Sequence, residues 1–189
     1  MTNELAAYLM TLGLTAAQAE KLSAVFSKKK KLDKGDYYHK EQQTCKSLAF
    51  ISEGMCRHFY RTDKGEVTRW VALKNEFVTS LGSLITQLPS RENIQAIKPT
   101  VLLIASLPDW QAIYKEEEFV RLLWLRTIEA NYVGFENRVF NLIALTAEER
   151  YEWMLKHQPR FNEFVPDKYI ASMLGIIPRH LSRIRANRK

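Results

Sequence analysis

The chain has 189 residues, of which 46% are hydrophobic and 26% are charged. This composition is typical of a folded globular protein of one or two domains, and it excludes a disordered or fibrous chain. No apolar run approaches the roughly 18 residues that cross a bilayer, and the first residues lack the basic start of a signal peptide. We therefore expect a cytoplasmic protein with no membrane partner. Its two cysteines, Cys45 and Cys56, are expected to be reduced thiols rather than a disulfide.

The formal net charge of +7 is concentrated near the C-terminal end. From Arg150 to Lys189, nine basic and three acidic residues give a charge of +6, which leaves +1 for the other 149 residues. This asymmetry favours an anionic polymer as partner, with nucleic acid as the leading candidate. The alternative is a solvated basic tail.

Apolar residues at three- and four-residue spacings predict a helix over residues 1–31, with Lys28–Lys31 in its last turn. From Leu32 to about Leu107, short apolar stretches alternate with Gly- and Pro-containing turns. This pattern predicts an antiparallel β sandwich or barrel. The predicted strands contain Leu48–Ile51, Phe59–Tyr60, Trp70–Leu73, Ile94–Ile97 and Val101–Ile104.

A long helix is predicted from about Lys115 to Leu145. Six of its apolar residues follow the 3-4-3-4-3 spacing of a coiled coil and are called the seam here. The seam consists of Leu125, Ile128, Tyr132, Phe135, Val139 and Leu142. We interpret it as the contact with a second copy of the chain, the alternative being a helix buried inside one chain. A second apolar line is expected to contact the chain's own β domain; it consists of Phe119, Leu123, Ala130, Val133 and Phe140.

The strongest functional signal is the segment from Asp167 to Ala186, which predicts two short helices joined by a tight turn. Gly175 allows a positive φ in the turn, and Pro178 favours the start of the second helix. Ala171 is small where the two helices must pack closely. The inner faces are expected to bury Ile170, Leu174, Leu181 and Ile184. This spacing is typical of a helix-turn-helix.

Arginines dominate the outer face of the second helix. Arg179 and Arg183 are four residues apart, so they project from one side of it. Arginine forks can engage guanine O6 and N7 in the major groove or bind phosphate. The segment therefore predicts a DNA-binding helix, the alternative being a terminal basic helix that enters no groove.

The order of these parts resembles the Crp–Fnr family (cyclic-AMP receptor protein/fumarate-nitrate regulator) of transcription regulators. The resemblance spans nearly the whole chain and rests on the seam helix and on Lys34-Gly35-Asp36, Ile51-Ser52-Glu53-Gly54, Glu149-Arg150-Tyr151, Ile170-Ala171-Ser172-Met173-Leu174-Gly175 and Leu181-Ser182-Arg183-Ile184. It implies an α+β fold with an N-terminal antiparallel β-roll (jelly roll) flanked by helices, a long dimerisation helix and a C-terminal helix-turn-helix. The implied boundaries are 1–114 for the effector domain, 115–145 for the dimerisation helix and 146–189 for the DNA-binding domain.

The resemblance also implies a homodimer that binds palindromic double-stranded DNA. By position, Arg179 and Arg183 would contact bases, and His180 and Ser182 would lie at the groove edge. The residues expected against phosphates are Lys168, Tyr169, Arg185 and Arg188.

The chain departs from the family in the segment that binds cyclic nucleotides, where members have a Gly-Glu pair and an Arg-Ser/Thr-Ala run. The corresponding stretches are residues 77–81 and 89–94, where Ser80 replaces the glutamate and Glu92, next to Arg91, would repel a phosphate. We therefore expect an effector other than cyclic AMP, or none. The candidate effector-binding residues are Thr79, Ser80, Leu81, Arg91, Glu92 and Asn93.

Two further departures concern the DNA-binding end. No residues are left to form a wing after the second helix, and Ile177 stands where a Ser or Thr would cap that helix. Two cysteines cannot hold an iron–sulfur cluster, which needs about four ligands. The sequence has no helical zinc pair of histidines, no phosphate-binding loop and no G-x-S-x-G elbow, so we expect no metal, no catalytic residue and no enzyme activity.

The sequence thus predicts a homodimeric, sequence-specific DNA-binding regulator, with a small molecule in the β-roll that reorients the seam helices. One alternative is a ligand-independent DNA-binding protein whose β-roll only dimerises or contacts RNA polymerase. The other is a cyclic-nucleotide or metabolite sensor that acts through protein partners.

Overall fold

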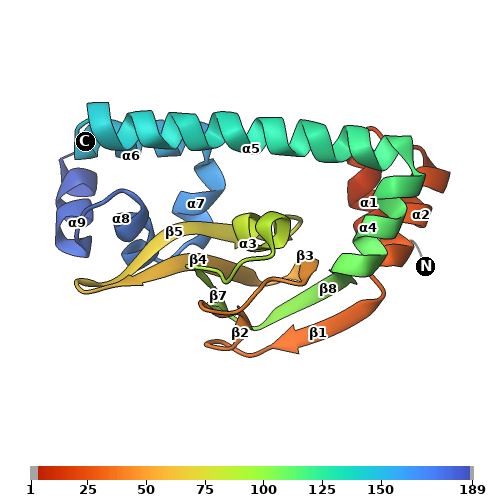
Figure 1. Cartoon of the computed structure of the whole chain (residues 1–189). Coiled ribbons are helices and arrows are strands. Elements are labelled where there is room, and N and C mark those ends of the chain that lie inside the picture. Colours follow the sequence, from red (N-terminus) through yellow and green to blue (C-terminus); the bar gives the residue numbers. More distant parts are fainter. Residues whose placement is uncertain (1–3, 188–189) are drawn as a thin grey trace.

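The computed structural model describes residues 4–187, which form an α+β protein (Figure 1). The strands are β1 (Lys28–Leu32), β2 (Tyr37–His39), β3 (Ser47–Glu53), β4 (Met55–Thr62), β5 (Gly65–Leu73), β6 (Phe77–Val78), β7 (Asn93–Ala96) and β8 (Thr100–Ser106). The helices are α1 (Glu4–Thr11), α2 (Ala16–Val25), α3 (Leu81–Thr86), α4 (Leu107–Glu116), α5 (Glu118–Ala144), α6 (Ala147–His157), α7 (Pro159–Phe164), α8 (Asp167–Met173) and α9 (Pro178–Ala186).

The strands form two four-stranded sheets, of order β1-β8-β3-β6 and β2-β7-β4-β5, and neighbouring strands are antiparallel. Both sheets contribute to a common core that includes Ile51, Ile94 and Leu102. The predicted β-roll is confirmed. At the turn between β3 and β4, Gly54 has a φ of +92°, and a Cβ there would lie 2.5 Å from the carbonyl oxygen of Pro99. Only glycine fits this turn.

The prediction of one helix over residues 1–31 is wrong. The described part of this segment forms α1 and α2, which are separated by a turn at Gly13, and the chain leaves helical geometry at Phe26. Lys28–Lys31 then belong to β1 and pair with β8. This strand lies at the edge of its sheet, where lysines are well tolerated because they discourage pairing with another chain.

Helix α5 runs along the whole molecule, with α1, α2 and α4 at one end and α6–α9 at the other (Figure 1). Its first half packs on the N-terminal helices through Phe119, Val120 and Leu123. The expectation that the entire second apolar line contacts the β domain is therefore only partly correct. Val133 and Phe140 are 54% and 60% exposed, and Ala130 is also exposed, because they lie beyond that contact.

The seam faces solvent in the single chain. Ile128 is half-buried, and the other five seam residues are between 39% and 62% exposed. A helix buried inside one chain would not leave such a row of large apolar side chains in water.

The C-terminal helices pack directly against the β-roll. One core cluster joins Met55, Val71 and Leu73 of the roll to Phe161 and Ile170 of the helices. The ring centroids of Trp70 and Phe161 lie 4.8 Å apart. The β-roll and the helix-turn-helix thus share one core. None of the helices within residues 4–187 is long and apolar enough to cross a membrane.

Candidate nucleic-acid interface

Helices α8 and α9 form the predicted helix-turn-helix. Gly175 has a φ of +70°, and the N–H of Ile176 donates to the carbonyl of Ala171 over 3.0 Å, which closes the end of α8. Ala171 is fully buried between the helices. Pro178 begins α9, and Ile177 precedes it without any side-chain cap, as the sequence predicted.

The two faces of α9 differ sharply. Leu181 and Ile184 are buried against the rest of the molecule, whereas Arg179, Ser182 and Arg183 are exposed. Within residues 4–187, the side chains of Arg179 and Arg183 make no hydrogen bond or ion pair. Their guanidinium groups are therefore available to an external anion.

Arg185 has a different environment from the other two arginines. Its Nε donates to the Tyr151 hydroxyl over 2.9 Å, and its two terminal nitrogens donate to Asp167 Oδ2 over 2.7 Å and to Asn162 Oδ1 over 3.0 Å. Tyr151 lies on α6, Asn162 on α7 and Asp167 on α8. Arg185 therefore ties α9 to three other helices, a role that the sequence did not reveal.

Three of the remaining predicted DNA contacts are described. Lys168 is exposed, whereas Tyr169 is only 9% exposed and packs in the core. His180 is half-buried, with its Nε2 3.6 Å from Glu148 Oε1. Arg188 lies outside the described residues. The structure therefore leaves Lys168 exposed and His180 partly exposed, and it turns Tyr169 inward.

The paired Arg185 and the unpaired Arg183 are expected to contribute differently to the free energy of unfolding. Arg185→Ala is expected to lower the free energy of unfolding by about 1.5–3 kcal/mol, because hydrogen bonds to charged groups are lost and Asp167 loses its cation. Arg183→Ala should change it by less than about 0.5 kcal/mol, since the side chain has no partner. Urea unfolding of both variants measures the difference. Equal stabilities would show that Arg185 does not fasten α9.

The predicted effector residues do not all face the same space. Ser80, Glu92 and Asn93 are buried in the β-roll, whereas Arg91 is exposed and Leu81 is half-buried. The hydroxyls of Ser80 and Ser90 lie 2.8 Å apart. The Thr79 hydroxyl instead donates to the carbonyl of Ser47 over 3.0 Å. Neighbouring residues differ in exposure here, and Arg91, the arginine that the sequence placed at the effector site, lies on the surface.

A charged cluster that the sequence did not predict fills this interior. Glu92 Oε2 lies 3.2 Å from His58 Nδ1 and 3.1 Å from a terminal nitrogen of Arg69. Burial opposes ionisation of Glu92, but the hydrogen bonds and charges of His58 and Arg69 outweigh it and lower the pKa of Glu92 to about 2. Burial also lowers the pKa of His58. The alternation of side chains along β4 and β5 could have indicated that His58 points inward, but not that it meets Glu92.

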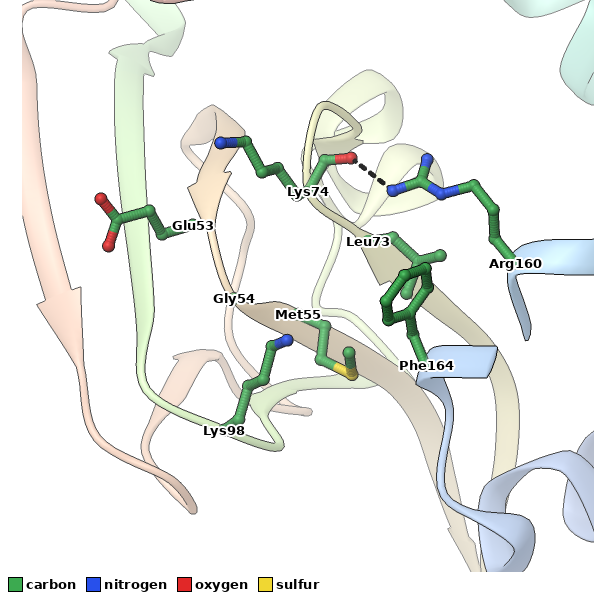
Figure 2. Close-up of a pocket in the computed structure, with 8 residues that line it drawn as sticks. All are labelled: Glu53, Gly54, Met55, Leu73, Lys74, Lys98, Arg160 and Phe164. Atoms are coloured by element: carbon green, nitrogen blue, oxygen red, sulfur yellow. Dashed lines mark hydrogen bonds between the residues drawn. The ribbon is translucent and has the colours of Figure 1, made fainter. Parts of the chain in front are cut away.

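A cavity of about 270 Å³ lies where the β-roll meets α7 (Figure 2). Met55, Leu73 and Phe164 supply its apolar side chains. Arg160 donates to the carbonyl of Lys74 across 3.4 Å, which connects α7 to the residue after β5. The cavity thus lies at the junction between the β-roll and the C-terminal helices.

No protein-family model matches the chain, and no curated protein matches it. Solved structures do match. FixK2 from Bradyrhizobium japonicum is 18% identical, with 85% of this chain and 83% of that chain covered and a TM-score of 0.71. A putative transcriptional regulator of the crp/fnr family from Eubacterium rectale is 17% identical over 94% of this chain and 85% of that one, with a TM-score of 0.66. The chain has the Crp–Fnr fold.

A third match to the Crp–Fnr fold is CLP, the c-di-GMP-responsive global regulator of Xanthomonas campestris. It is 14% identical, with 92% of this chain and 91% of that chain covered and a TM-score of 0.69. The similarity extends over the β-roll, α5 and the helix-turn-helix together, because nearly the whole of each chain is aligned. At these identities, the likeness establishes the fold, and the function has to be argued from the residues.

Proposed function

We propose that this protein is a transcription regulator that binds double-stranded DNA as a homodimer. The observation that carries the proposal is the pair of free, exposed arginines, Arg179 and Arg183, on a helix whose opposite face is buried. A helix of this kind is presented to the major groove in helix-turn-helix proteins. The charge of +6 over residues 150–189 supplies attraction to phosphates.

The exposed seam of α5 supports the dimer. Its residues recur at coiled-coil spacing and face solvent, so a second copy of α5 would bury them. A two-fold axis along α5 would relate two copies of α9. Two recognition helices can then occupy successive major grooves, about 34 Å apart.

The buried Glu92 supports an effector other than a cyclic nucleotide, or none. Its carboxylate is already neutralised by Arg69 and lies in the segment that corresponds to the nucleotide-binding residues of the family. A cyclic phosphate entering there would meet a carboxylate, and Arg91 is exposed on the outside. We therefore keep two hypotheses, a DNA-binding regulator that responds to a ligand and one that does not. The free arginines on α9 favour both of these over a sensor that acts only through protein partners.

The proposal is tested by fluorescence anisotropy with labelled DNA from upstream of the gene, in the presence of competitor DNA. Arg179→Ala and Arg183→Ala are each expected to weaken selective binding by about tenfold to a hundredfold, because a base-contacting arginine contributes about 1–3 kcal/mol. Lys29→Ala removes an exposed cation from β1 and is the control. Unchanged selective binding in the Arg179→Ala/Arg183→Ala double variant would contradict the proposal.

A further inference from the structure

A second cavity, of about 420 Å³, lies far from α9, between the N-terminal helices, the β-roll and the first half of α5. Its walls are rich in aromatic side chains. The rings of Trp110 and Trp124 have centroids 5.2 Å apart, and those of Phe26 and Phe77 have centroids 5.6 Å apart. This volume and this lining are typical of a site for one small organic molecule.

Most of the polar side chains that line this cavity come from α5. Arg126 and Asn131, both exposed, contribute to its lining from α5. Within residues 4–187, the guanidinium group of Arg126 makes no hydrogen bond or ion pair. The side-chain amide nitrogen of Asn131 donates to the carbonyl of Thr127 over 2.8 Å. The side-chain oxygen of Asn131 is thereby left to accept a hydrogen bond from a ligand. The cavity thus combines an apolar interior with an unpaired cation on its α5 wall.

The cavity and the seam use largely different faces of α5. Leu123, Thr127 and Ala130 line it, and they lie on one face of α5 because they are four and three residues apart. The seam residues Leu125 and Ile128 follow Leu123 and Thr127 by two positions and one, which is about 200° and 100° around the helix. Leu123, Thr127 and Ala130 therefore lie on a different face from the seam, whereas Trp124 and Asn131 lie between the two faces, four residues before Ile128 and Phe135.

We propose that this cavity binds a small molecule with an aromatic or aliphatic body and an anionic head. The body would contact Trp110, Trp124 and Phe77, and the head would pair with Arg126. None of the effector residues that the sequence predicted lines this site, although Phe77 begins one of the two stretches that contain them. Because α5 carries both this cavity and the seam, a ligand here contacts the element that we propose to form the dimer. The connection between the ligand and the dimer rests on the proposed function, whereas the binding site itself does not.

The probe for the test is 1-anilinonaphthalene-8-sulfonate, which has an aromatic body and one sulfonate. Titration into the full chain is expected to quench tryptophan fluorescence and to saturate at one molecule per chain, because two of the four tryptophans line the cavity. Arg126→Gln should weaken binding by about tenfold or more, since a hydrogen bond to a charged group is lost. Ala130→Trp fills the cavity from α5 and should abolish binding.

Two matched variants serve as controls. Lys64→Gln removes an exposed cation from the turn between β4 and β5, and Ala144→Trp adds a tryptophan at the exposed end of α5. Both should bind the probe like the wild type. Absence of saturable binding, or equal binding by Arg126→Gln, Ala130→Trp and the controls, would overturn the site. DNA affinity is measured separately, so that a wild type that binds the probe and no DNA would contradict the proposed function alone.

Discussion

Phe135→Asp is expected to convert a dimer into a monomer and to weaken binding to a full operator by about 100-fold or more, the gain that bivalent attachment usually provides. Phe135 lies in the seam and is 55% exposed in the single chain. In a dimer with two-fold symmetry, each seam residue lies near its own copy. Two carboxylates would then be buried close together without a partner, which is strongly unfavourable.

The measurement is sedimentation equilibrium, which distinguishes the chain mass of 22.0 kDa from twice that value. Val133→Asp is the matched control, because Val133 is equally exposed, at 54%, but lies on a different face of α5. We expect it to remain dimeric. Dimers of unchanged stability in Phe135→Asp would show that the seam is not the contact between chains.

Glu92→Gln is expected to lower the free energy of unfolding by about 2–3 kcal/mol, because it removes the anion from a buried charged cluster. The side chain of Arg69 is 34% exposed and can still reach water, which keeps the loss below that of a fully buried pair. Glu66→Gln is the control. Glu66 is 41% exposed, and its partner Arg57 also donates to Gln95 Oε1, so we expect a loss below about 1 kcal/mol. Equal losses in urea unfolding would contradict this difference.

The same cluster predicts a pH dependence of stability. The pKa of Glu92 falls to about 2 in the folded chain from an ordinary value of 4.5, so its contribution is present above pH 4.5 and is lost as the pH falls toward 2. Burial lowers the pKa values of His58 and His39 below 6.5, so the folded state resists their protonation. The free energy of unfolding is therefore expected to decrease as the pH falls, below 6.5 because of the two histidines and more steeply below 4.5 because of Glu92. In Glu92→Gln, the loss of stability below pH 4.5 should be smaller than in the wild type.

Periodicity indicated most of the fold, because the longer strands and α5 carry strong patterns. Periodicity failed where contacts between distant parts of the chain determine the secondary structure or the burial of a residue. Lys28–Lys31 have no apolar pattern, and they form a strand only because β8 offers a free edge for pairing. The two residues of β6 are likewise too few to show a strand pattern. Val133 and Phe140 follow the helical spacing of buried residues, but they are 54% and 60% exposed, because they lie beyond the part of α5 that packs on the N-terminal helices.

The helix-turn-helix was predictable because its requirements are local. Gly175, Pro178 and the free arginines lie within one short segment. Arg185 has the same chemistry as Arg183, but its partners Tyr151 and Asp167 lie 34 and 18 residues away. No local pattern distinguishes the two. The cluster around Glu92 was missed for the same reason, since His58 and Arg69 come from other strands.

The most direct test of a dimeric DNA-binding regulator is selection of bound sequences by the full chain from a pool of random double-stranded DNA. We expect an enriched inverted repeat whose half-site centres are about 34 Å apart, or about 10 base pairs, because two α9 helices must occupy successive major grooves. The Arg179→Ala/Arg183→Ala variant should enrich no sequence. A wild type that also enriches none, or that enriches only a single half-site, would contradict the proposed function.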